Sequence, residues 1–314
     1  MIIPSLPVIY IITPTVNLIT QRAHLTRMTH TLALVPNVRW IVIEDANEPS
    51  SKVANILKNS QHPYAHLYIH REYNDLNHYR GCAQRNLGIA WLRNSFHVYE
   101  SSIPTPSSKS NTTNHRKSMS QSTFYTQMAS HFENKYRKST NPFQRKSLRS
   151  STNSPVWQDN TYNKNGIVYF ADDDNIYDLD LFYQMREIKS VGVWPVAFCG
   201  GIYLERPLVV NGKVAEWLVA YDKKRPMATD MAGFAVNLNL FLKNSDVYFD
   251  ELHNPDGLES NFLRKIVDLQ HLEPLANSCT QILVWHTQTK KPILKLESNF
   301  RKMYNVSSIQ NMEI

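Results

Sequence analysis

The stretch Gly166-Ile-Val-Tyr-Phe-Ala-Asp-Asp-Asp-Asn175 decides the fold class of this 314-residue chain. Its first six residues have the length and apolar composition of a buried strand, and the acids Asp172–Asp174 follow directly. Three adjacent like charges repel one another, and a divalent cation with oxygen ligands would relieve that repulsion. The alternative is an acidic turn in which Asp178 or Asp180 caps the next helix. The sequence of this stretch leaves both interpretations open.

Strand and helix signals alternate on the N-terminal side of this stretch. The alternation predicts an α/β fold with a mainly parallel sheet covered by helices on both faces. Because parallel strands end at the same edge of a sheet, we expect Thr13-Pro14-Thr15 and Glu44-Asp45 to lie near the aspartates. The predicted strands are Val8–Ile12, Val38–Ile43 and Ala65–Ile69, and the predicted helices are Gln21–Leu34, Val53–Leu57 and Gly81–Leu92.

The C-terminal side offers further polar residues at the ends of predicted elements. Asp230 and Glu259 lie at loop-to-helix junctions and His286 ends a strand, so each is either a cap, a buried polar group or a site residue. Arg80 and Arg85 are either diphosphate ligands or solvated surface charges. Here the predicted helices are Asp180–Ile188, Met231–Leu242 and Asn261–Leu269, and the predicted strands are Gly192–Phe198 and Ile282–Trp285.

A long segment from about Asn94 to Lys164 has no sustained periodicity. It is rich in Ser, Thr, Asn and Lys, a composition that cannot offset the ordering entropy of the backbone, so it predicts a disordered insertion. Residues 101–154 carry a net charge of +8, whereas the whole chain carries +7, so the remainder is at −1. The basic charge therefore belongs to the insertion, and no nucleic-acid partner is expected for the folded core.

Cysteine spacing and hydropathy exclude several other classes of protein. Cys82, Cys199 and Cys279 form no C-x-x-C pair, which argues against a redox motif, a zinc cluster or a disulfide scaffold. The apolar run Ile2–Ile12 is broken by two prolines and falls short of the ~20 residues that a membrane-spanning helix needs.

Nine motifs, taken together and in order, resemble the β-1,3-glucuronyltransferases. The resemblance covers almost the whole chain outside the insertion. The motifs are Ile12–Thr15, Trp40–Ala46, Arg80–Asn86, Val168–Asn175, Val193–Val196, Asp230–Val236, Leu258–Ser260, Leu272–Pro274 and Ile282–Thr287.

The resemblance implies a GT-A glycosyltransferase fold. Residues 1–175 would form a Rossmann-like half that binds the UDP-sugar, and residues 176–314 an acceptor-binding and catalytic half. The reaction implied is inverting transfer of glucuronic acid from UDP-glucuronic acid to the 3-hydroxyl of a terminal galactose on a glycan. Mn²⁺ would be the cofactor. A homodimer is expected, held at the Golgi membrane by an N-terminal anchor that is not part of this sequence.

Roles for individual residues follow from the same resemblance. Glu259 would be the catalytic base and Asp174 the main ligand of Mn²⁺. The acceptor sugar would be bound by Glu205, Tyr221 and Arg225. The donor nucleotide sugar would be bound by Pro14, Thr15, Asp45, Arg80, Arg85, Asp172, Asp173, Asp230 and His286.

Three positions depart from the family pattern near the donor. Val16 stands where the family has a tyrosine against uracil, Gln288 where it has an arginine, and Ala83 where it has a glutamate. These departures keep two other hypotheses open. One is an impaired family member that acts as a binding or partner subunit, and the other is a transferase for a different UDP-sugar.

Overall fold

The computed structural model describes residues 3–70, 81–102, 165–220, 224–252, 257–287, 289–290, 294–308 and 310, with side chains to residue 96 in the second range. Three residues singled out in the sequence, Arg80, Tyr221 and Gln288, lie outside the described residues, as does most of the predicted insertion.

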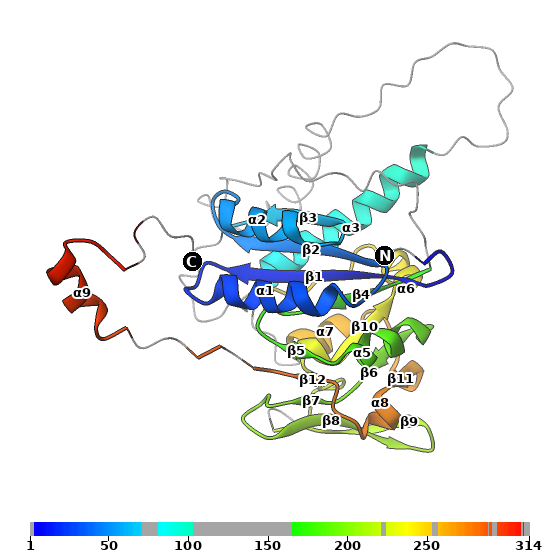
Figure 1. The fold of residues 1–314 in the computed structure, drawn as a ribbon. Coiled ribbons are helices and arrows are strands. Elements are labelled where there is room, and N and C mark those ends of the chain that lie inside the picture. Colours follow the sequence, from blue (N-terminus) through cyan, green and yellow to red (C-terminus); the bar gives the residue numbers. More distant parts are fainter. Residues whose placement is uncertain are drawn as a thin grey trace, which may run out of the picture.

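A mainly parallel seven-stranded sheet forms the centre of the fold (Figure 1). Its strand order is β11-β6-β10-β4-β1-β2-β3. Strand β1 pairs in parallel with β2 and β4, and only β10 runs antiparallel to its neighbours. The predicted α/β class is therefore confirmed. The strands are β1 (Val8–Val16), β2 (Val38–Asp45), β3 (Tyr64–Tyr68), β4 (Gly166–Phe170), β6 (Val191–Val193), β10 (Phe234–Asn237) and β11 (Leu272–Pro274).

Helices cover both faces of this sheet. Alternate residues of β1 enter two apolar clusters, Ile9 and Ile11 one and Tyr10 and Ile12 the other, so both faces are buried. One cluster is closed by α1 (Gln21–Leu32), α2 (Ser51–Asn59) and α5 (Leu179–Gln184), and the other by α3 (Cys82–Ser102), α6 (Leu238–Lys243) and α7 (Leu258–Leu263). Short 3-10 turns η2 (Met185–Glu187), η3 (Met231–Gly233) and η4 (Leu269–His271), with α8 (Ala276–Cys279), complete this body.

A smaller sheet lies below the large one in Figure 1. Its order is β5-β12-β7-β8-β9. The β8–β9 hairpin turns at Asn211 and Gly212, whose φ angles of 51° and 74° fall in the left-handed region that these two residue types favour. The strands are β5 (Ile176–Tyr177), β7 (Val196–Ala197), β8 (Leu204–Val210), β9 (Lys213–Leu218) and β12 (Val284–Trp285).

Four boundaries predicted from the sequence are wrong. Asn261–Leu269 is not one helix, because α7 spans Leu258–Leu263 and a turn separates it from η4, which begins at Leu269. Met231–Leu242 is not one helix but η3, strand β10 and helix α6, because its apolar core pairs between β4 and β6. Gly192–Phe198 is not one strand, because Trp194-Pro195 separates β6 of the large sheet from β7 of the small one. Helix α3 continues to Ser102, beyond the predicted start of the insertion at Asn94.

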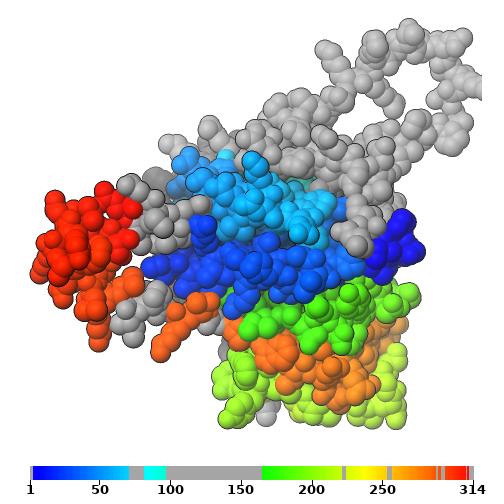
Figure 2. Space-filling view, viewed as in Figure 1, coloured from blue at the N-terminus to red at the C-terminus, as the bar shows by residue number. Residues whose placement is uncertain are grey.

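The chain's early and late residues occupy different parts of the surface. In Figure 2 the blue N-terminal residues form one band of the body, and green to orange residues form the band below it. The last helix, α9 (Glu297–Tyr304), stands to one side and buries none of its residues (Figure 2). Within the described part of the chain, no helix has the length and hydropathy to cross a bilayer. The division into donor and acceptor halves at residue 175 stays a prediction.

Candidate active site

The acidic turn Asp172–Asp174 follows β4 at the edge where β1 also ends. Thr15, near the end of β1, donates a hydrogen bond from Oγ1 to Oδ2 of Asp173 at 2.6 Å. Gln21 Nε2, in the first turn of α1, donates to Thr15 Oγ1 at 3.1 Å. The predicted meeting of these two strand ends is therefore confirmed, and it occurs through side chains.

Other side chains hold the backbone of the acidic turn. Arg27 and Thr287 both donate to the carbonyl oxygen of Asp174, the threonine from Oγ1 at 3.1 Å. Tyr177 Oη donates to the carbonyl oxygen of Asp172 at 2.7 Å. These contacts engage the backbone of the turn, and the described side-chain contacts to its carboxylates are those of Thr15 with Asp173 and of Arg85 with Asp172.

Two other carboxylates cap helices, which is the alternative role that the sequence left open for them. Asp178 accepts from the backbone N–H of Asp180 at 2.9 Å, at the start of α5. Asp230 accepts from the backbone N–H of Ala232 at 2.9 Å, at the start of η3. The capping role thus explains Asp178, whereas Asp230 also lies among the charged groups described below.

Two carboxylates of the turn, Asp173 and Asp174, have raised pKa values. Burial raises the pKa of Asp173 to about 7 against the hydrogen bond from Thr15, and the neighbouring Asp174 and Asp172 raise it further. Burial, followed by the charge of Asp172, also raises the pKa of Asp174, while His286 and Arg27 act in the opposite direction. An added cation would relieve this repulsion, and carboxylate oxygens are the ligands that hard divalent ions prefer.

Protein side chains would supply only part of such a cation's coordination. Among the described residues, no group of three His, Cys, Asp or Glu side chains is arranged to hold a metal ion. A site of this kind takes one or two carboxylates from the protein and its other ligands from water and substrate phosphates. Asp174 and its neighbours fit that partial role.

Arg85 places a guanidinium against the acidic turn. It lies in the first turns of α3, is 6% exposed, and donates from Nη2 to Oδ1 of Asp172. A planar guanidinium beside carboxylates, at the ends of parallel strands, suits the binding of a diphosphate. The structure therefore brings this predicted donor residue to the predicted place.

Glu259 is a half-buried carboxylate at the start of α7, with 18% of its side chain exposed. Gly257, with φ of 79°, turns the chain into this helix, and a Cβ there would lie 2.7 Å from Cδ of Arg225. The close approach leaves Arg225 Nη1 at 3.9 Å from Glu259 Oε2. Burial raises the pKa of Glu259 to about 7, Asp230 adds to the rise, and Arg225 and Arg85 oppose it. A carboxylate with a pKa near neutral is suited to accept a proton.

Asp230 connects the remaining predicted residues into the same site. Burial raises the pKa of Asp230, the N–H of Ala232 and the charge of His286 lower it, and Asp172 and Glu205 raise it. Glu205 is 6% exposed and accepts from the backbone N–H of Ala220 at 3.1 Å. The backbone N–H of His286 donates a hydrogen bond to the carbonyl oxygen of Ala197 at 2.8 Å, which fixes the position of the chain at His286.

Two predicted donor residues lie at the rim of this edge. Asp45 ends β2, and its Oδ1 accepts a hydrogen bond from Nδ1 of His70 at 3.2 Å. Val16 pairs in register with Asp45, and Val16 is 46% exposed. Pro14 is half-buried in β1 opposite Ile43.

Four further residues shape the site but were given no role from the sequence. Gln21, Arg27, Tyr177 and Thr287 contact the acidic turn or Thr15. The partners of Arg27 and Thr287 lie more than a hundred residues away in sequence, whereas Gln21 and Tyr177 lie five or six residues from theirs and belong to no motif.

The rings of Phe170, Phe234, Phe249 and Phe262, here the aromatic cluster, lie behind the site residues. Their neighbouring centroids are 4.2 to 6.3 Å apart. The cluster joins β4, which leads to the acidic turn, β10, which follows Asp230, and α7, which carries Glu259. From the sequence, the apolar pattern predicts only that these four phenylalanines lie in the hydrophobic core.

The mainly parallel α/β sheet, the acidic turn at its strand ends, the buried arginine beside that turn and the carboxylate with a pKa of about 7 agree with the GT-A glycosyltransferase that the sequence motifs led us to expect. The family model described as Glycosyltransferase family 43 matches residues 28–103 and 106–290. This chain belongs to glycosyltransferase family 43, which confirms the resemblance found in the sequence motifs.

Curated relatives agree with this assignment over nearly the whole chain. Galactosylgalactosylxylosylprotein 3-beta-glucuronosyltransferase 1 of Rattus norvegicus is 38% identical over 301 residues, covering 92% of this chain and 71% of the relative. The Homo sapiens protein of the same name gives the same identity and coverage. Galactosylgalactosylxylosylprotein 3-beta-glucuronosyltransferase 2 of Canis lupus familiaris is 36% identical over 95% of this chain and 73% of its own length.

Solved structures superpose more distantly. The superposition with S. aureus TarS 1–349 covers 89% of this chain and 60% of the TarS chain, at 12% identity and a TM-score of 0.43. A similarity this distant says nothing about the substrate or the site.

Proposed function

We propose that this protein is an inverting β-1,3-glucuronosyltransferase that moves glucuronic acid from UDP-glucuronic acid to the 3-hydroxyl of a terminal galactose. The relatives named above are glucuronosyltransferases, and the family assignment supports a glycosyl transfer. The observation that carries the proposal is Glu259, whose pKa burial raises to about 7 and whose charge is coupled to Asp230 and Arg85.

Glu259 is the general base of the proposed reaction. Its carboxylate takes the proton of the acceptor 3-hydroxyl while that oxygen forms a bond to C1 of the glucuronic acid. The bond from C1 to the phosphate oxygen breaks with its electron pair leaving on UDP, so the anomeric centre inverts in one displacement. A positioned base of this kind contributes roughly 10²–10⁴-fold in rate.

Asp174 holds the metal in this proposal, and Asp172 and Asp173 share the acidic turn with it. The ion is Mn²⁺, which when bound would stabilise the negative charge that develops on the pyrophosphate. The raised pKa values of Asp173 and Asp174 support a cation here. A bound cation would offset the burial and the like charges that raise these two pKa values.

The other predicted residues bind the two substrates. Pro14, Thr15 and Asp45 face the uridine, and Arg80 and Arg85 the diphosphate and donor sugar. Asp172, Asp230 and His286 hold the glucuronic acid. Glu205, Tyr221 and Arg225 orient the acceptor. Two observations support the acceptor assignment: Arg225 Nη1 lies 3.9 Å from Glu259 Oε2, and the charge of Glu205 acts on Asp230, which in turn acts on Glu259.

Galactose-terminated glycans of proteoglycan linkers or glycoproteins are the acceptor class that we propose. We further propose a homodimer, and residence at the Golgi membrane through an N-terminal anchor beyond this sequence. These assignments rest on the family to which the chain belongs.

A product assay tests the function. The protein is incubated with Mn²⁺, a panel of terminal galactosides, and UDP-glucuronic acid in competition with UDP-glucose, UDP-galactose and UDP-N-acetylglucosamine. The proposal predicts a glucuronylated product whose NMR spectrum shows a β-1,3 linkage. A product from another donor alone would establish a different UDP-sugar. No product from any donor, together with no calorimetric binding of UDP at millimolar concentration, would favour the inactive binding subunit.

A further inference from the structure

Helix α7, which carries the proposed base, is too short to be stable on its own. It spans six residues, Leu258–Leu263, and its N-cap Gly257 provides no side-chain hydrogen bond. Isolated helices of fewer than about 12 residues are marginal in water, so tertiary contacts must fix this one. The orientation of Glu259 therefore depends on what holds its neighbours in the helix.

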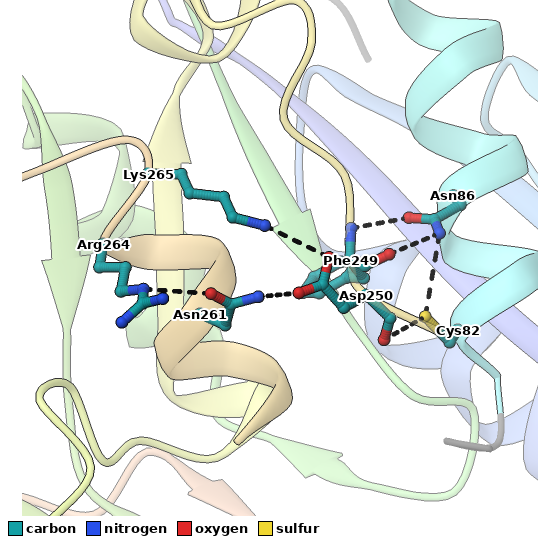
Figure 3. A network of polar contacts seen from close by, with 7 residues as sticks. All are labelled: Cys82, Asn86, Phe249, Asp250, Asn261, Arg264 and Lys265. Atoms are coloured by element: carbon teal, nitrogen blue, oxygen red, sulfur yellow. Dashed lines mark hydrogen bonds and ion pairs between the residues drawn. The ribbon is translucent and has the colours of Figure 1, made fainter. Parts of the chain in front are cut away.

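Asn261 links α7 to Asp250. It is 2% exposed, and its Nδ2 donates to Oδ2 of Asp250 (Figure 3). Its Oδ1 accepts from Nε of Arg264 at 3.1 Å. On the other side, Ser260 Oγ accepts from the backbone N–H of Met227 at 3.0 Å, two residues after Arg225. Adjacent residues of α7 are thus tied to separate segments of the chain.

The segment that contains Asp250 is in turn fixed to helix α3. The backbone N–H and C=O of Phe249 pair with the side-chain amide of Asn86, both at 2.9 Å, as an adjacent strand would (Figure 3). Asn86 is fully buried, and Cys82 Sγ donates to the carbonyl oxygen of Asp250 at 3.4 Å. Asn86 directly follows Arg85, the arginine that contacts the acidic turn.

An aromatic contact runs beside these polar ones. The rings of Phe249 and Phe262 are stacked, with centroids 4.2 Å apart and planes at 21°. Residues 249 and 250 therefore meet α7 through both a ring and a carboxylate. A segment fixed by both kinds of contact transmits position better than one held by apolar packing alone, because the hydrogen bond restricts rotation and translation together.

We propose that Asp250 is a positioning residue for the transfer reaction: through Asn261 it sets the orientation of Glu259, and through the Phe249–Asn86 pairing it registers that base against the arginine side of the site. This inference rests on the proposed function of Glu259 as base. Asp250 acts through other residues and contacts neither substrate.

Kinetics of Asp250→Ala test the inference, with UDP-glucuronic acid and a galactoside as substrates. The Asp250 side chain is 41% exposed, so its truncation is compatible with folding. Misplacing a reacting group by about 1 Å costs about 10²-fold, so we expect kcat to fall 10- to 100-fold and both KM values to stay within about twofold. Asn261→Ala removes the same hydrogen bond from the other side and should give a matching fall.

Lys265→Ala is the matched control. It removes the ion pair between Lys265 Nζ and Asp250 Oδ1, which measures 3.3 Å and is exposed, but leaves Asp250 bonded to Asn261. We expect its kcat to stay within about twofold of the original, because exposed pairs contribute little. A loss as large as that of Asp250→Ala would show that charge, rather than the positioning of α7, decides the effect, and would overturn the inference.

The double variant Asp250→Ala/Glu259→Gln separates positioning from general damage. If Asp250 acts through the base, adding its substitution to Glu259→Gln changes the residual transfer rate less than about twofold. If Asp250→Ala slows transfer by the same factor with Glu259 as with glutamine at the base position, the inference is overturned. Full kcat in a folded Asp250→Ala or Asn261→Ala protein also overturns it. Should Glu259→Gln itself keep full activity, the proposed function fails. Should it lose transfer while Asp250→Ala does not, only the positioning role fails.

Discussion

Substituting Glu259 by glutamine should greatly slow transfer and at the same time stabilise the protein at pH 8. Glutamine keeps the size of the side chain but cannot accept a proton, so we expect kcat to fall by roughly 10²–10⁴-fold. UDP binding, which does not involve the base, should be unchanged. Loss of activity coupled to a gain in stability is a combination that a merely structural residue would not give.

The size of the gain follows from the pKa of the carboxyl group. Burial raises the pKa of Glu259 from 4.5 to about 7, so the folded protein holds this proton more tightly than the unfolded chain. The resulting stabilisation is complete below pH 4.5 and is lost as the pH rises through about 7. At about 1.36 kcal/mol per pH unit, ionising the group in the folded state costs roughly 3 kcal/mol above neutrality. Glutamine avoids that cost.

Urea denaturation of both proteins at pH 8 and pH 5 measures the effect. At pH 8 we expect Glu259→Gln to raise the free energy of unfolding by about 2–3 kcal/mol, and at pH 5 by under about 1 kcal/mol. The unsubstituted protein should transfer about tenfold faster for each pH unit up to about 7, and then at a constant rate. A stability gain equal at the two pH values, or near-full transfer by the variant, would refute the assignment of Glu259 as a base whose pKa is raised in the folded protein.

Three further substitutions test other parts of the account. Arg85→Met leaves the Asp172 carboxylate without its guanidinium partner and should lower the free energy of unfolding by about 3 kcal/mol in urea, and a loss below about 1 kcal/mol would contradict the buried pair. Val16→Tyr adds a ring at the exposed end of β1, and a stacking gain of about 1–3 kcal/mol should tighten UDP binding by calorimetry about 5- to 150-fold, whereas unchanged affinity would place uracil elsewhere. Phe262→Ala empties the centre of the aromatic cluster and should cost about 3–5 kcal/mol, while the exposed Tyr304→Ala should change stability by under about 0.5 kcal/mol, and equal effects would deny the cluster its structural role.

The parallel strands could be predicted because each is buried on both faces. Gly166–Ala171 is a continuous apolar run and Val38–Ile43 is apolar except for Arg39, which is the pattern of a covered strand, and polar residues at their ends indicated the site. Phe234–Asn237 could not be predicted in the same way, because a run of three apolar residues before an asparagine fits a helix and a strand equally well. Its place in the sheet depends on β4 and β6, which lie far from it in sequence.

The site divides along the same line. Asp172, Asp230 and Glu259 could be proposed from motifs, because local sequence identifies them, and the electrostatic coupling among Asp172, Asp230, Glu205 and His286 supports their proximity. Supporting contacts such as Arg27 to Asp174 and Asn86 to Phe249 could not, since each joins elements more than a hundred residues apart. The β8–β9 hairpin did carry a usable signal, the Asn211-Gly212 pair, which predicts a tight turn.

The central claim is that the acidic turn and Glu259 form one site around a metal-bound pyrophosphate. Anomalous diffraction from crystals grown with Mn²⁺ and UDP tests it most directly. We predict a manganese peak against the Asp174 carboxylate, in contact with the diphosphate, with Glu259 facing the end of that diphosphate across the pocket. Nucleotide bound with no manganese at this turn, or manganese bound at a distance from it, would contradict the account.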